Sequence, residues 1–395
     1  MLNLTALLYS SLGLDRFDDR IVPTSAQQTT LERAKNDIRD HLRPRIRAVT
    51  VTVLGMSRAV EPKFRSQGSQ RYKTCLQPVH LPPQEMDWDY GVYLPVTVWE
   101  EKGPPRAMAK LYFDLVEGLL RELCQQRGWK LVQGRDRKDN CVRIQIDSWA
   151  HIDIPLYAAS EQAFSKITER ALLKAASSRF AMDSAMDAAN RAGELVEQEW
   201  DDLEHVVMAT RSGEWKASDP EIVTRWFLDR MEQHGPQLRR VCRYVKAWRD
   251  YHWQSGGPTS VSMMIAVAQD FVPQAGRDDK ALEHAARLLA QKLSGPIREH
   301  GIDQGQEDFN RLDDRGRAEA AALAGQLANQ LRDARMQRVG LESQAISFLT
   351  GQLGSRIPQR TDLVVPDQSD EHVRTVPARQ VTPPVVPPTK AGKAG

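Results

Sequence analysis

The chain has few cysteines and no long apolar run, and both features limit what it can be. Its four cysteines among 395 residues are widely spaced and include no C-x-x-C pair. This pattern excludes a cysteine-rich zinc site and a disulfide framework, and it is typical of free thiols in a reducing compartment. No apolar stretch approaches the roughly 20 residues that a membrane-spanning helix needs. We therefore expect a cytoplasmic protein that makes no contact with a membrane.

The chain also lacks a strong charge of either sign. Its 54 Lys and Arg residues nearly balance its 52 Asp and Glu residues, which leaves a net charge of +2. Domains that coat nucleic acid are usually strongly basic, so we expect no strong nucleic-acid binding. A basic run between residues 33 and 47 is more often a solvated helix face than a phosphate-binding one.

The periodic segments of the first 160 residues predict helices packed on a sheet. A capped amphipathic helix is expected over 26–42, and Pro44 should kink or end it. Another helix is expected over 106–126, where leucines lie four apart. The expected extended segments lie at 49–54, 86–89, 92–98, 129–133, 141–147 and 151–156. This order predicts an α+β fold.

The chain divides by composition into three parts. Residues 1–160 are expected to form the α+β core with an N-terminal helix. Residues 161–355 are expected to form a helical lobe, with an irregular polar connection at 301–314. Residues 356–395 contain seven prolines and no aromatic residue. Such a composition cannot support a packed core, so we expect a disordered, Pro-rich tail there.

Asp87 and Asp89 are the first candidates for chemistry. They lie one residue apart in a predicted strand, so both carboxylates point to one side while Trp88 points to the other. An Asp-x-Asp pair is most often solvated surface, but this one lies among apolar and aromatic residues, where unpaired charge is costly. A divalent cation relieves the repulsion between converging carboxylates, and Mg²⁺ prefers oxygen ligands. Trp88 itself has no explanation at this level.

Asp153 supplies a third carboxylate. It lies in the alternating segment HIDIPL, where Ile152 and Ile154 face one way and His151 and Asp153 face the other. Three carboxylates on neighbouring strands can hold two Mg²⁺ ions, with Mn²⁺ as an alternative. On its own, Asp153 is equally well read as a strand-end cap or a salt-bridge partner.

The dipeptide Gly68-Ser69 is a candidate phosphate-binding turn. Glycine lets the backbone approach a phosphate, and a following helix offers unpaired N–H groups. Gly-Ser alone is uninformative. Gly-Ser followed 18 residues after Ser69 by an apolar-flanked Asp-x-Asp, and then by a distant strand aspartate, is a specific combination.

Segments containing these residues resemble a known family. QGS, EMDWDYGVYLP and HIDIPLY resemble the cGAS/DncV-like nucleotidyltransferases (CD-NTases) of bacterial antiphage (CBASS) signalling, and GEWKASDPEIVTRWF is similar to a segment of their helical half. The resemblance implies a polymerase-β-like nucleotidyltransferase core, a mostly helical second lobe and an active site in the cleft between them. It implies a cyclic dinucleotide synthase of the cyclic GMP-AMP type, which joins ATP and GTP and releases pyrophosphate. The product would activate an effector in antiviral defence.

The resemblance also implies roles for individual residues. Asp87, Asp89 and Asp153 would be the catalytic ligands of two Mg²⁺ ions. The implied nucleotide-binding residues are Gln67, Gly68, Ser69, Tyr72, Arg143, Ser218, Lys246, Ser260 and Asp308.

The residues alone allow plainer roles for several of these positions. Ser218 and Ser260 are candidate helix N-caps. Lys246 is by default a solvated lysine, and Arg143 in an alternating strand is either a base-stacking or a surface residue. Asp308 matches the family only across a gap.

Two other functions stay open. An enzyme with the same core could make a cyclic trinucleotide or a linear oligonucleotide, or transfer a nucleotide to another molecule. An inactive nucleotide- or RNA-binding module is the second alternative, and the three carboxylates count against it. Some synthases of the family are joined to other molecules through their C-terminal residue by a ubiquitin-transfer-like enzyme, which would make Gly395 a conjugation site.

Overall fold

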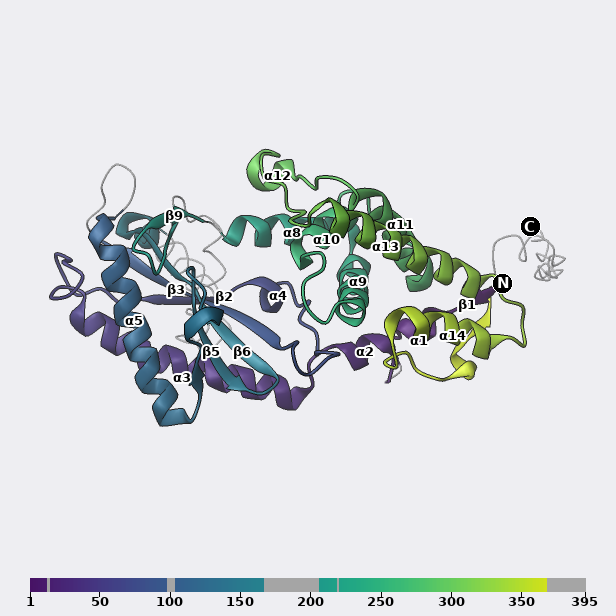
Figure 1. Cartoon of the computed structure of the whole chain (residues 1–395), viewed down its shortest axis with the longest axis horizontal. Coiled ribbons are helices and arrows are strands. Elements are labelled where there is room, and N and C mark those ends of the chain that lie inside the picture. Colours follow the sequence, from purple (N-terminus) through teal and green to yellow (C-terminus); the bar gives the residue numbers. More distant parts are fainter. Residues whose placement is uncertain (13–14, 98–103, 167–205, 219, 368–395) are drawn as a thin grey trace, which may run out of the picture.

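The molecule consists of an α+β core and a helical lobe that follow one another along its long axis (Figure 1). The computed structural model describes residues 1–12, 15–97, 104–166, 206–218 and 220–367.

The core is organised around β3 (Met86–Val96), the central strand of its mixed sheet. On one edge, β2 (Lys63–Ser66) pairs antiparallel with β3. On the other edge, β6 (Ala150–Ile154) and β7 (Leu156–Ser160) pair with it in parallel and in one continuous register. The predicted strands at 86–89 and 92–98 are therefore one strand, because no turn interrupts the ladder between them.

Four shorter or peripheral strands extend the sheet by antiparallel pairs. They are β5 (Val142–Asp147) on β6, β4 (Lys130–Leu131) on β5, β8 (Val207–Ala209) on β7 and β9 (Trp215–Ala217) on β8. β8 and β9 lie beyond the predicted boundary at residue 160, so the core sheet continues to residue 217.

Two long helices, α3 (Ser25–Val49) and α5 (Arg106–Arg127), cover one face of the sheet (Figure 1). Their apolar stripes pack on the even-numbered side chains of β3 in one hydrophobic core. Pro44 lies inside α3 and does not end it. The buried residues Leu42 and Ile46 flank Pro44, so packing on the sheet outweighs the lost backbone hydrogen bond. The predicted extended segment at 49–54 is consequently the end of α3 and a turn.

The first elements of the chain pack in the helical lobe, which corrects their assignment to the core. β1 (Leu2–Asn3) pairs with β10 (Val365–Pro366). α1 (Thr5–Leu8) and α2 (Phe17–Ile21) contribute Leu7, Leu8 and Phe17 to the hydrophobic core of the lobe. The sequence predicted an N-terminal helix but did not show which domain would bury it.

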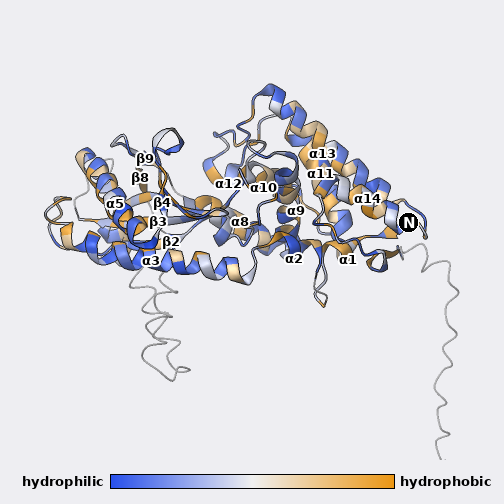
Figure 2. Cartoon of the chain, turned by 60° about the horizontal axis from the view of Figure 1, so that its bottom comes forward, coloured by the Kyte–Doolittle hydropathy of each residue, from blue (hydrophilic) through white to orange (hydrophobic). Residues whose placement is uncertain are grey.

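The lobe is built from helices that bury their apolar faces against one another. Hydrophobic and hydrophilic residues alternate along its longer helices (Figure 2). The helices are α8 (Pro220–His234), α9 (Pro236–His252), α10 (Ser260–Ala268), α11 (Asp278–Lys292), α12 (His300–Asp303), α13 (Asp314–Arg335) and α14 (Glu342–Leu353). The single turn α12 lies in the connection that was predicted to be irregular.

The predicted tail begins later than residue 356. The short helix η4 (Thr361–Leu363) and β10 pack on the lobe, and Ile357 is completely buried. Asp367 forms an ion pair with Arg277 of the lobe. A few apolar residues among the prolines are thus enough to fix this segment. Residues 368–395, including Gly395, lie outside the described residues.

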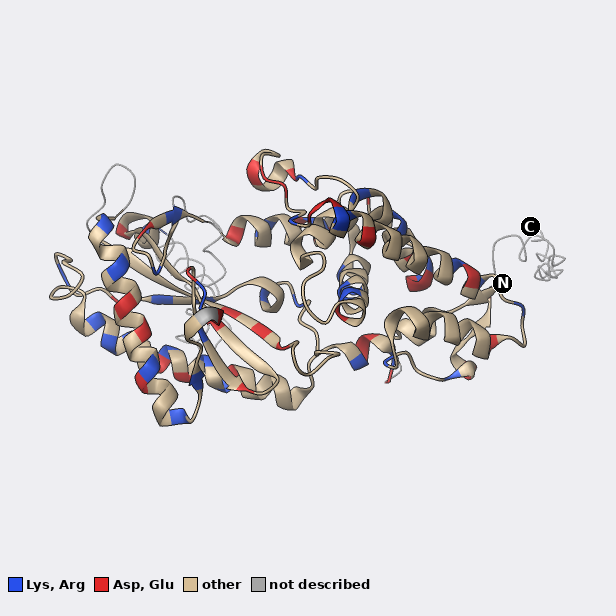
Figure 3. Ribbon diagram, viewed as in Figure 1, with Lys and Arg blue, Asp and Glu red and all other residues tan. Residues whose placement is uncertain are grey.

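The surface and the thiols agree with the sequence in two respects. Lys and Arg are interspersed with Asp and Glu along α3 and α5 (Figure 3), and Arg39 and Arg127 pair with Asp40 and Asp37. All four cysteines are free and buried. In the part of the chain that the structure describes, no helix is long and apolar enough to cross a membrane.

Candidate active site

Three aspartates meet on the sheet face opposite α3 and α5. β3 and β6 run parallel, with Asp87 opposite His151 and Asp89 opposite Asp153. Residues directly opposite each other on neighbouring strands share a face, so these four side chains form a compact patch. β5 extends the patch by placing Arg143 opposite Asp153.

Trp88 points away from this patch into the core. Its side chain is only 4% exposed, and its indole Nε1 donates to Ser66 Oγ at 3.1 Å. Lys35 of α3 places its ammonium 5.4 Å from the ring centroid. A large residue between the two aspartates therefore packs the sheet against α3, which explains Trp88 without a role in chemistry.

Asp153 is held by two cationic side chains. Arg143 donates from Nε to Oδ1 at 2.6 Å and from Nη2 to Oδ2 at 2.7 Å, and Lys138 Nζ donates to Oδ2 at 2.6 Å. Burial raises the pKa of Asp153, but the hydrogen bonds and charges of Arg143 and Lys138 outweigh it and lower the pKa to about 2. Asp153 is thus ionised and available as a ligand.

The pKa of Asp89 is shifted in the opposite direction from that of Asp153. Burial raises its pKa, and the negative charges of Asp87 and Asp153 raise it further, to about 7. A carboxyl group that resists ionisation beside two other carboxylates marks a site whose negative charge is not fully neutralised by Arg143 and Lys138. A divalent cation would supply the missing positive charge.

His151 lies between two carboxylates. Its Nδ1 is 2.7 Å from Glu85 Oε2 and its Nε2 is 3.0 Å from Asp87 Oδ1. Burial lowers the pKa of His151, but the contact with Asp87 and its charge outweigh burial and raise it. Asp87, His151 and Asp153 each offer one ligand atom, and these atoms lie within 4.8 Å of one another, so the three residues could hold a metal ion.

The Gly68-Ser69 turn lies directly against Asp89. Gly68 has a φ of +58°, and a Cβ at this position would lie 2.4 Å from Asp89 Oδ2. The turn begins α4 (Gly68–Arg71), and the backbone N–H of Gln67 donates to the backbone carbonyl of Asp89 at 2.9 Å. Glycine is required here for both backbone conformation and space.

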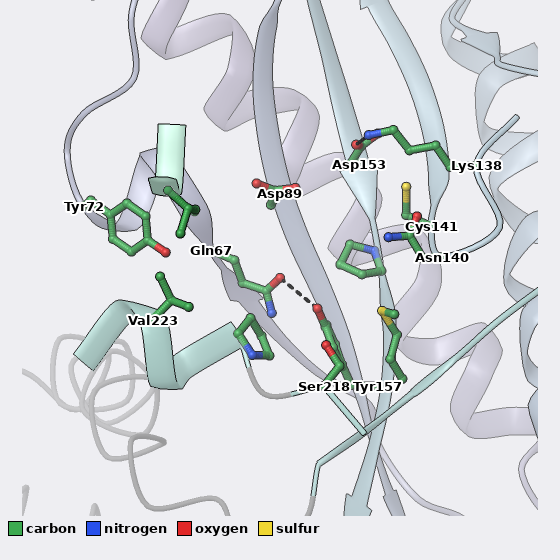
Figure 4. Close-up of a pocket in the computed structure, with 15 residues that line it drawn as sticks. Gln67, Tyr72, Asp89, Lys138, Asn140, Cys141, Asp153, Tyr157, Ser218 and Val223 are labelled. Atoms are coloured by element: carbon green, nitrogen blue, oxygen red, sulfur yellow. Dashed lines mark hydrogen bonds and ion pairs between the residues drawn. The ribbon is translucent and has the colours of Figure 1, made fainter. Parts of the chain in front are cut away.

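Two pockets have Asp89 in their lining. The first, which we call the Tyr157 pocket, has a volume of 290 Å³ and is lined by Asp89, Asp153, Lys138, Ser218 and Tyr157 among others (Figure 4). The second, the Lys246 pocket, has a volume of 360 Å³ and is lined by Asp87, Asp89, Ser69, Lys246 and Ser260 among others. Gly68, Tyr72, Asp89 and Val261 line both.

Residues of both lobes form each pocket. Gln67 lines the Tyr157 pocket, where its side-chain carbonyl accepts from the Tyr157 hydroxyl (Figure 4). The side-chain Nε2 of Gln67 donates to the Tyr93 hydroxyl at 2.6 Å. Lys246 on α9 is buried and donates from Nζ to the Thr74 carbonyl at 2.6 Å, so it is not a solvated lysine. Burial lowers its pKa.

The predicted capping role is wrong for Ser260 and stays untested for Ser218. Thr259 caps α10 by accepting from the Ser262 amide, so Ser260 is the first helical residue and its predicted capping role is wrong. Thr259 and Ser260 are adjacent and both have a hydroxyl that can cap a helix. The sequence alone could not show which of the two does so. The cap of α8 depends on residue 219, which lies outside the described residues, so capping by Ser218 stays a prediction.

Asp308 contacts neither pocket and stabilises a turn of the lobe. Its carboxylate accepts from the amides of Ile297 and Asn310 and pairs with Arg317 at 2.6 Å. A nucleotide contact by Asp308 therefore has no support in this structure.

Three neighbours of the aspartates were missed in the sequence. Glu85 and His151 flank Asp87, and Lys138 contacts Asp153. The alternation in HIDIPL did place His151 on the face of Asp153, which was a usable signal. Lys138 reaches the patch from the loop before β5, and no periodic pattern indicates such a contact.

Two family models match the chain on either side of this site. The nucleotidyltransferase-domain model of DncV-like cyclic GMP-AMP synthases matches residues 62–157, and the C-terminal-domain model of cyclic GMP-AMP synthases matches residues 235–366. Together they cover more than half of the chain. The chain belongs to the DncV-like nucleotidyltransferase family.

Named relatives of this DncV-like chain are cyclic GMP-AMP synthases. The one from Vibrio cholerae is 36% identical over 242 residues, which are 59% of this chain and 52% of the relative. One from Escherichia coli is 36% identical over 258 residues, which are 64% of this chain and 54% of the relative. The chain thus spans about half the length of the curated relatives it matches.

Solved structures share the fold of this DncV-like chain. A mutant Vibrio cholerae dinucleotide cyclase in complex with ATP, GTP and 5MTHFGLU2 matches with a TM-score of 0.73 at 24% identity, covering 92% of this chain and 99% of that one. The Vibrio cholerae synthase in complex with the linear intermediate pppA(3′,5′)pG matches with a TM-score of 0.72 at 23% identity, covering 93% and 99%. The predicted polymerase-β-like core with a helical lobe is confirmed.

Proposed function

We propose that this DncV-like nucleotidyltransferase is a cyclic dinucleotide synthase of the cyclic GMP-AMP type. The observation that carries the proposal is that two pockets share Asp89, which allows two nucleotides to lie on either side of one carboxylate patch. The relatives that match the chain are named cyclic GMP-AMP synthases. The complexes of the Vibrio cholerae enzyme with ATP and GTP support the same two substrates here.

The residues that would hold two Mg²⁺ ions are Asp87, Asp89 and Asp153, with Mn²⁺ as an alternative ion. The patch fits a cation because three carboxylates converge and one of them resists ionisation. When bound, the ions would supply positive charge to the attacking and leaving oxygens.

Residues of the chain would bind and orient the two nucleotides. In each step a ribose hydroxyl oxygen bonds to the α-phosphorus of the other nucleotide, the bond from that phosphorus to pyrophosphate breaks, and the hydroxyl proton is released. Ser69, Lys246 and Ser260 line the pocket suited to a triphosphate, because a lysine charge and two hydroxyls gather there. Tyr157 and Met208 line the other pocket, where a base can stack. A second step of the same kind closes the ring.

One experiment separates this function from its alternatives. The full chain is incubated with Mg²⁺ and labelled ATP, GTP, CTP and UTP, and the products are treated with phosphatase. A cyclic product resists phosphatase, and mass spectrometry distinguishes a ring of two nucleotides from a ring of three. With the label on the α-phosphate, a linear oligonucleotide loses only the label of its 5′-terminal phosphate and keeps that of its internal linkages. Complete release of the label means that no nucleotides were joined, which indicates an inactive binding module.

A double variant and a matched control assign the activity to the patch. Asp87→Asn with Asp89→Asn should abolish the product while leaving the circular dichroism spectrum unchanged. Asp114→Asn on the exposed face of α5 removes a carboxylate far from the patch in sequence and should leave the product unchanged. Product from the double variant at the wild-type rate would refute the assignment.

The cellular setting follows from this proposed activity. We place the enzyme in the cytoplasm, where nucleoside triphosphates are available and four free thiols stay reduced. Its product would act on an effector that binds cyclic nucleotides, in antiviral defence. Conjugation through Gly395 stays a prediction, and mass spectrometry of the C-terminal peptide would test it.

A further inference from the structure

His151 occupies a position from which it could bind a metal ion with the aspartates. It lies opposite Asp87 on the neighbouring strand and two residues before Asp153, so all three side chains face the same side of the sheet. Only 6% of its surface is exposed. A buried imidazole on a patch of carboxylates needs a physical reason, because burial of a polar ring without partners is costly.

The two ring nitrogens of His151 are not equivalent. Nδ1 lies 2.7 Å from Glu85 Oε2, which orients the ring. Nε2 is shielded from water, lies 3.0 Å from Asp87 Oδ1, and makes no hydrogen bond of acceptable geometry. Nε2 is thus a buried nitrogen that points into the patch without a well-formed partner there.

This arrangement is the one that metal-binding histidines usually have. A ligating imidazole donates its other N–H to a carboxylate, which fixes the ring orientation and makes the ligating nitrogen more basic. Glu85 has that role here. In the metal-free protein a proton on Nε2 can face Asp87, and a bound cation would take the place of that proton.

We propose that His151 is a metal ligand, and that Asp87, His151 and Asp153 form a site for a divalent transition-metal ion. The ligand atoms that these residues offer lie within 4.8 Å of one another. A set with one imidazole nitrogen and two carboxylates favours first-row transition ions, whereas Mg²⁺ prefers oxygen alone. The side chain of Lys138, whose positive charge balances the negative charge of Asp153, is 41% exposed. It can therefore move into solvent when a cation binds.

His151 would add one ligand to the carboxylate patch of the proposed function, and only in this respect does the metal site rest on that function. The cation itself is therefore the readout, and neither nucleotide nor turnover is required. Mn²⁺ is the probe, because its unpaired electrons report both the free ion and the nuclei bonded to it.

The first experiment measures affinity on the metal-free full chain without nucleotide. The electron paramagnetic resonance signal of free Mn²⁺ gives its dissociation constant, and competition gives that of Mg²⁺. We expect His151→Gln to weaken Mn²⁺ binding at least tenfold and Mg²⁺ binding less than threefold. Glu85→Gln should weaken Mn²⁺ binding by about tenfold, since it removes only the orienting charge. His300→Gln, at an exposed histidine of α12, is the matched control and should change neither.

The second experiment tests directly for a bond between bound Mn²⁺ and a nitrogen atom. Electron spin-echo modulation of bound Mn²⁺ should show coupling to ¹⁴N in the wild type. The coupling should change to the ¹⁵N pattern when only histidine is labelled with ¹⁵N, and it should be absent from His151→Gln. Bound Mn²⁺ without nitrogen coupling in the wild type would overturn the proposal, as would an unchanged ratio of Mn²⁺ to Mg²⁺ affinity in His151→Gln.

The two proposals fail in different ways. Cyclic product without nitrogen coupling refutes the histidine ligand and leaves the synthase intact. Nitrogen coupling without any product from four triphosphates refutes the synthase and leaves the metal site.

Discussion

Gly68 approaches Asp89 so closely that a Cβ on Gly68 would lie 2.4 Å from the carboxylate Oδ2. The preceding residue contacts the same aspartate, since the backbone N–H of Gln67 donates to the backbone carbonyl of Asp89 at 2.9 Å. The Gly-Ser turn and the carboxylate strand therefore set each other's position. A phosphate held by the turn would lie next to any cation held by the carboxylates.

Gly68→Ala should abolish activity without unfolding the protein. The added methyl group collides with Asp89 and also disfavours the φ of +58°, so either the turn or the carboxylate must move. Gly276→Ala is the matched control, because Gly276 has a φ of +65° and nothing within 4 Å of its Cβ position. Both variants should lose about 1–2 kcal/mol of stability. Only Gly68→Ala should lose product by 100-fold or more, and equal activity of the two variants would contradict this.

Lys138→Met should strengthen cation binding to the nucleotide-free protein. Lys138 Nζ lies 2.6 Å from Asp153 Oδ2 and competes electrostatically with any cation there. We expect Mn²⁺ to bind about 3- to 10-fold more tightly by calorimetric titration. The partly exposed ion pair itself should contribute less than about 1 kcal/mol to stability. Lys130→Met, at an exposed lysine of β4, should leave the affinity unchanged. Weaker binding by Lys138→Met would show that the lysine organises the patch.

The stability of the metal-free protein should fall as pH rises from about 4 to 7. Burial and the charges of Asp87 and Asp153 raise the pKa of Asp89 from 3.8 to about 7, so the folded chain binds more protons than the unfolded chain in this window. The loss should be about 2–4 kcal/mol. Urea unfolding in a chelator should show this slope in the wild type and a flatter one in Asp89→Asn. An identical slope in that variant would assign the effect to another group.

Asp153 should have the opposite effect at lower pH. Its pKa is lowered to about 2, so its stabilising pairing with Arg143 and Lys138 is present above about pH 4 and is lost as pH falls through 2.

Trp88→Leu should destabilise the core while leaving the site competent. Trp88 is buried against α3 and donates to Ser66, on the face away from Asp87 and Asp89. Truncation should cost about 2–4 kcal/mol in urea unfolding. Activity per folded molecule, measured well below the melting temperature, should stay within about threefold. Asp87→Asn should show the reverse pattern, and a Trp88→Leu protein that is stable but inactive would place Trp88 in the site after all.

The sequence was sufficient for the parts of the site that depend on strand alternation. Period-two patterns placed Asp87, Asp89 and Asp153 on one face, and the parallel register of β3 and β6 then brings them together. The same pattern put His151 beside them. Strand boundaries were less certain, since the segments predicted at 86–89 and 92–98 are parts of one strand, β3.

Contacts between distant segments could not be predicted in the same way. Lys138 reaches Asp153 from a loop, and the N-terminal leucines pack in the far lobe. Periodicity shows that a face is apolar but not which partner will cover it. The predicted start of the tail was wrong for a related reason. Composition describes a segment as a whole and does not show that single residues in it are buried, as Ile357 and Val364 are.

The segment after the Gly-Ser turn is fastened to the helical lobe, and this leads to the last prediction. Arg243 on α9 donates from Nε and Nη2 to the Lys73 carbonyl at 2.9 and 2.7 Å, and Lys246 donates to the next carbonyl, that of Thr74. The position of the turn should therefore depend on α9. Arg243→Ala should raise the KM for triphosphate about 5- to 30-fold, since it removes about 1–2 kcal/mol of hydrogen bonding that holds the turn in place.

Arg239→Ala is the matched control for this effect. Arg239 lies one turn earlier on the same helix and contacts Met231 within the lobe. Both variants remove a guanidinium from α9, but only Arg243→Ala frees the segment after the turn. Steady-state kinetics should show a raised KM for Arg243→Ala alone. A similar KM for both variants would mean that the turn keeps its position through Asp89 and Gln67, independently of the lobe.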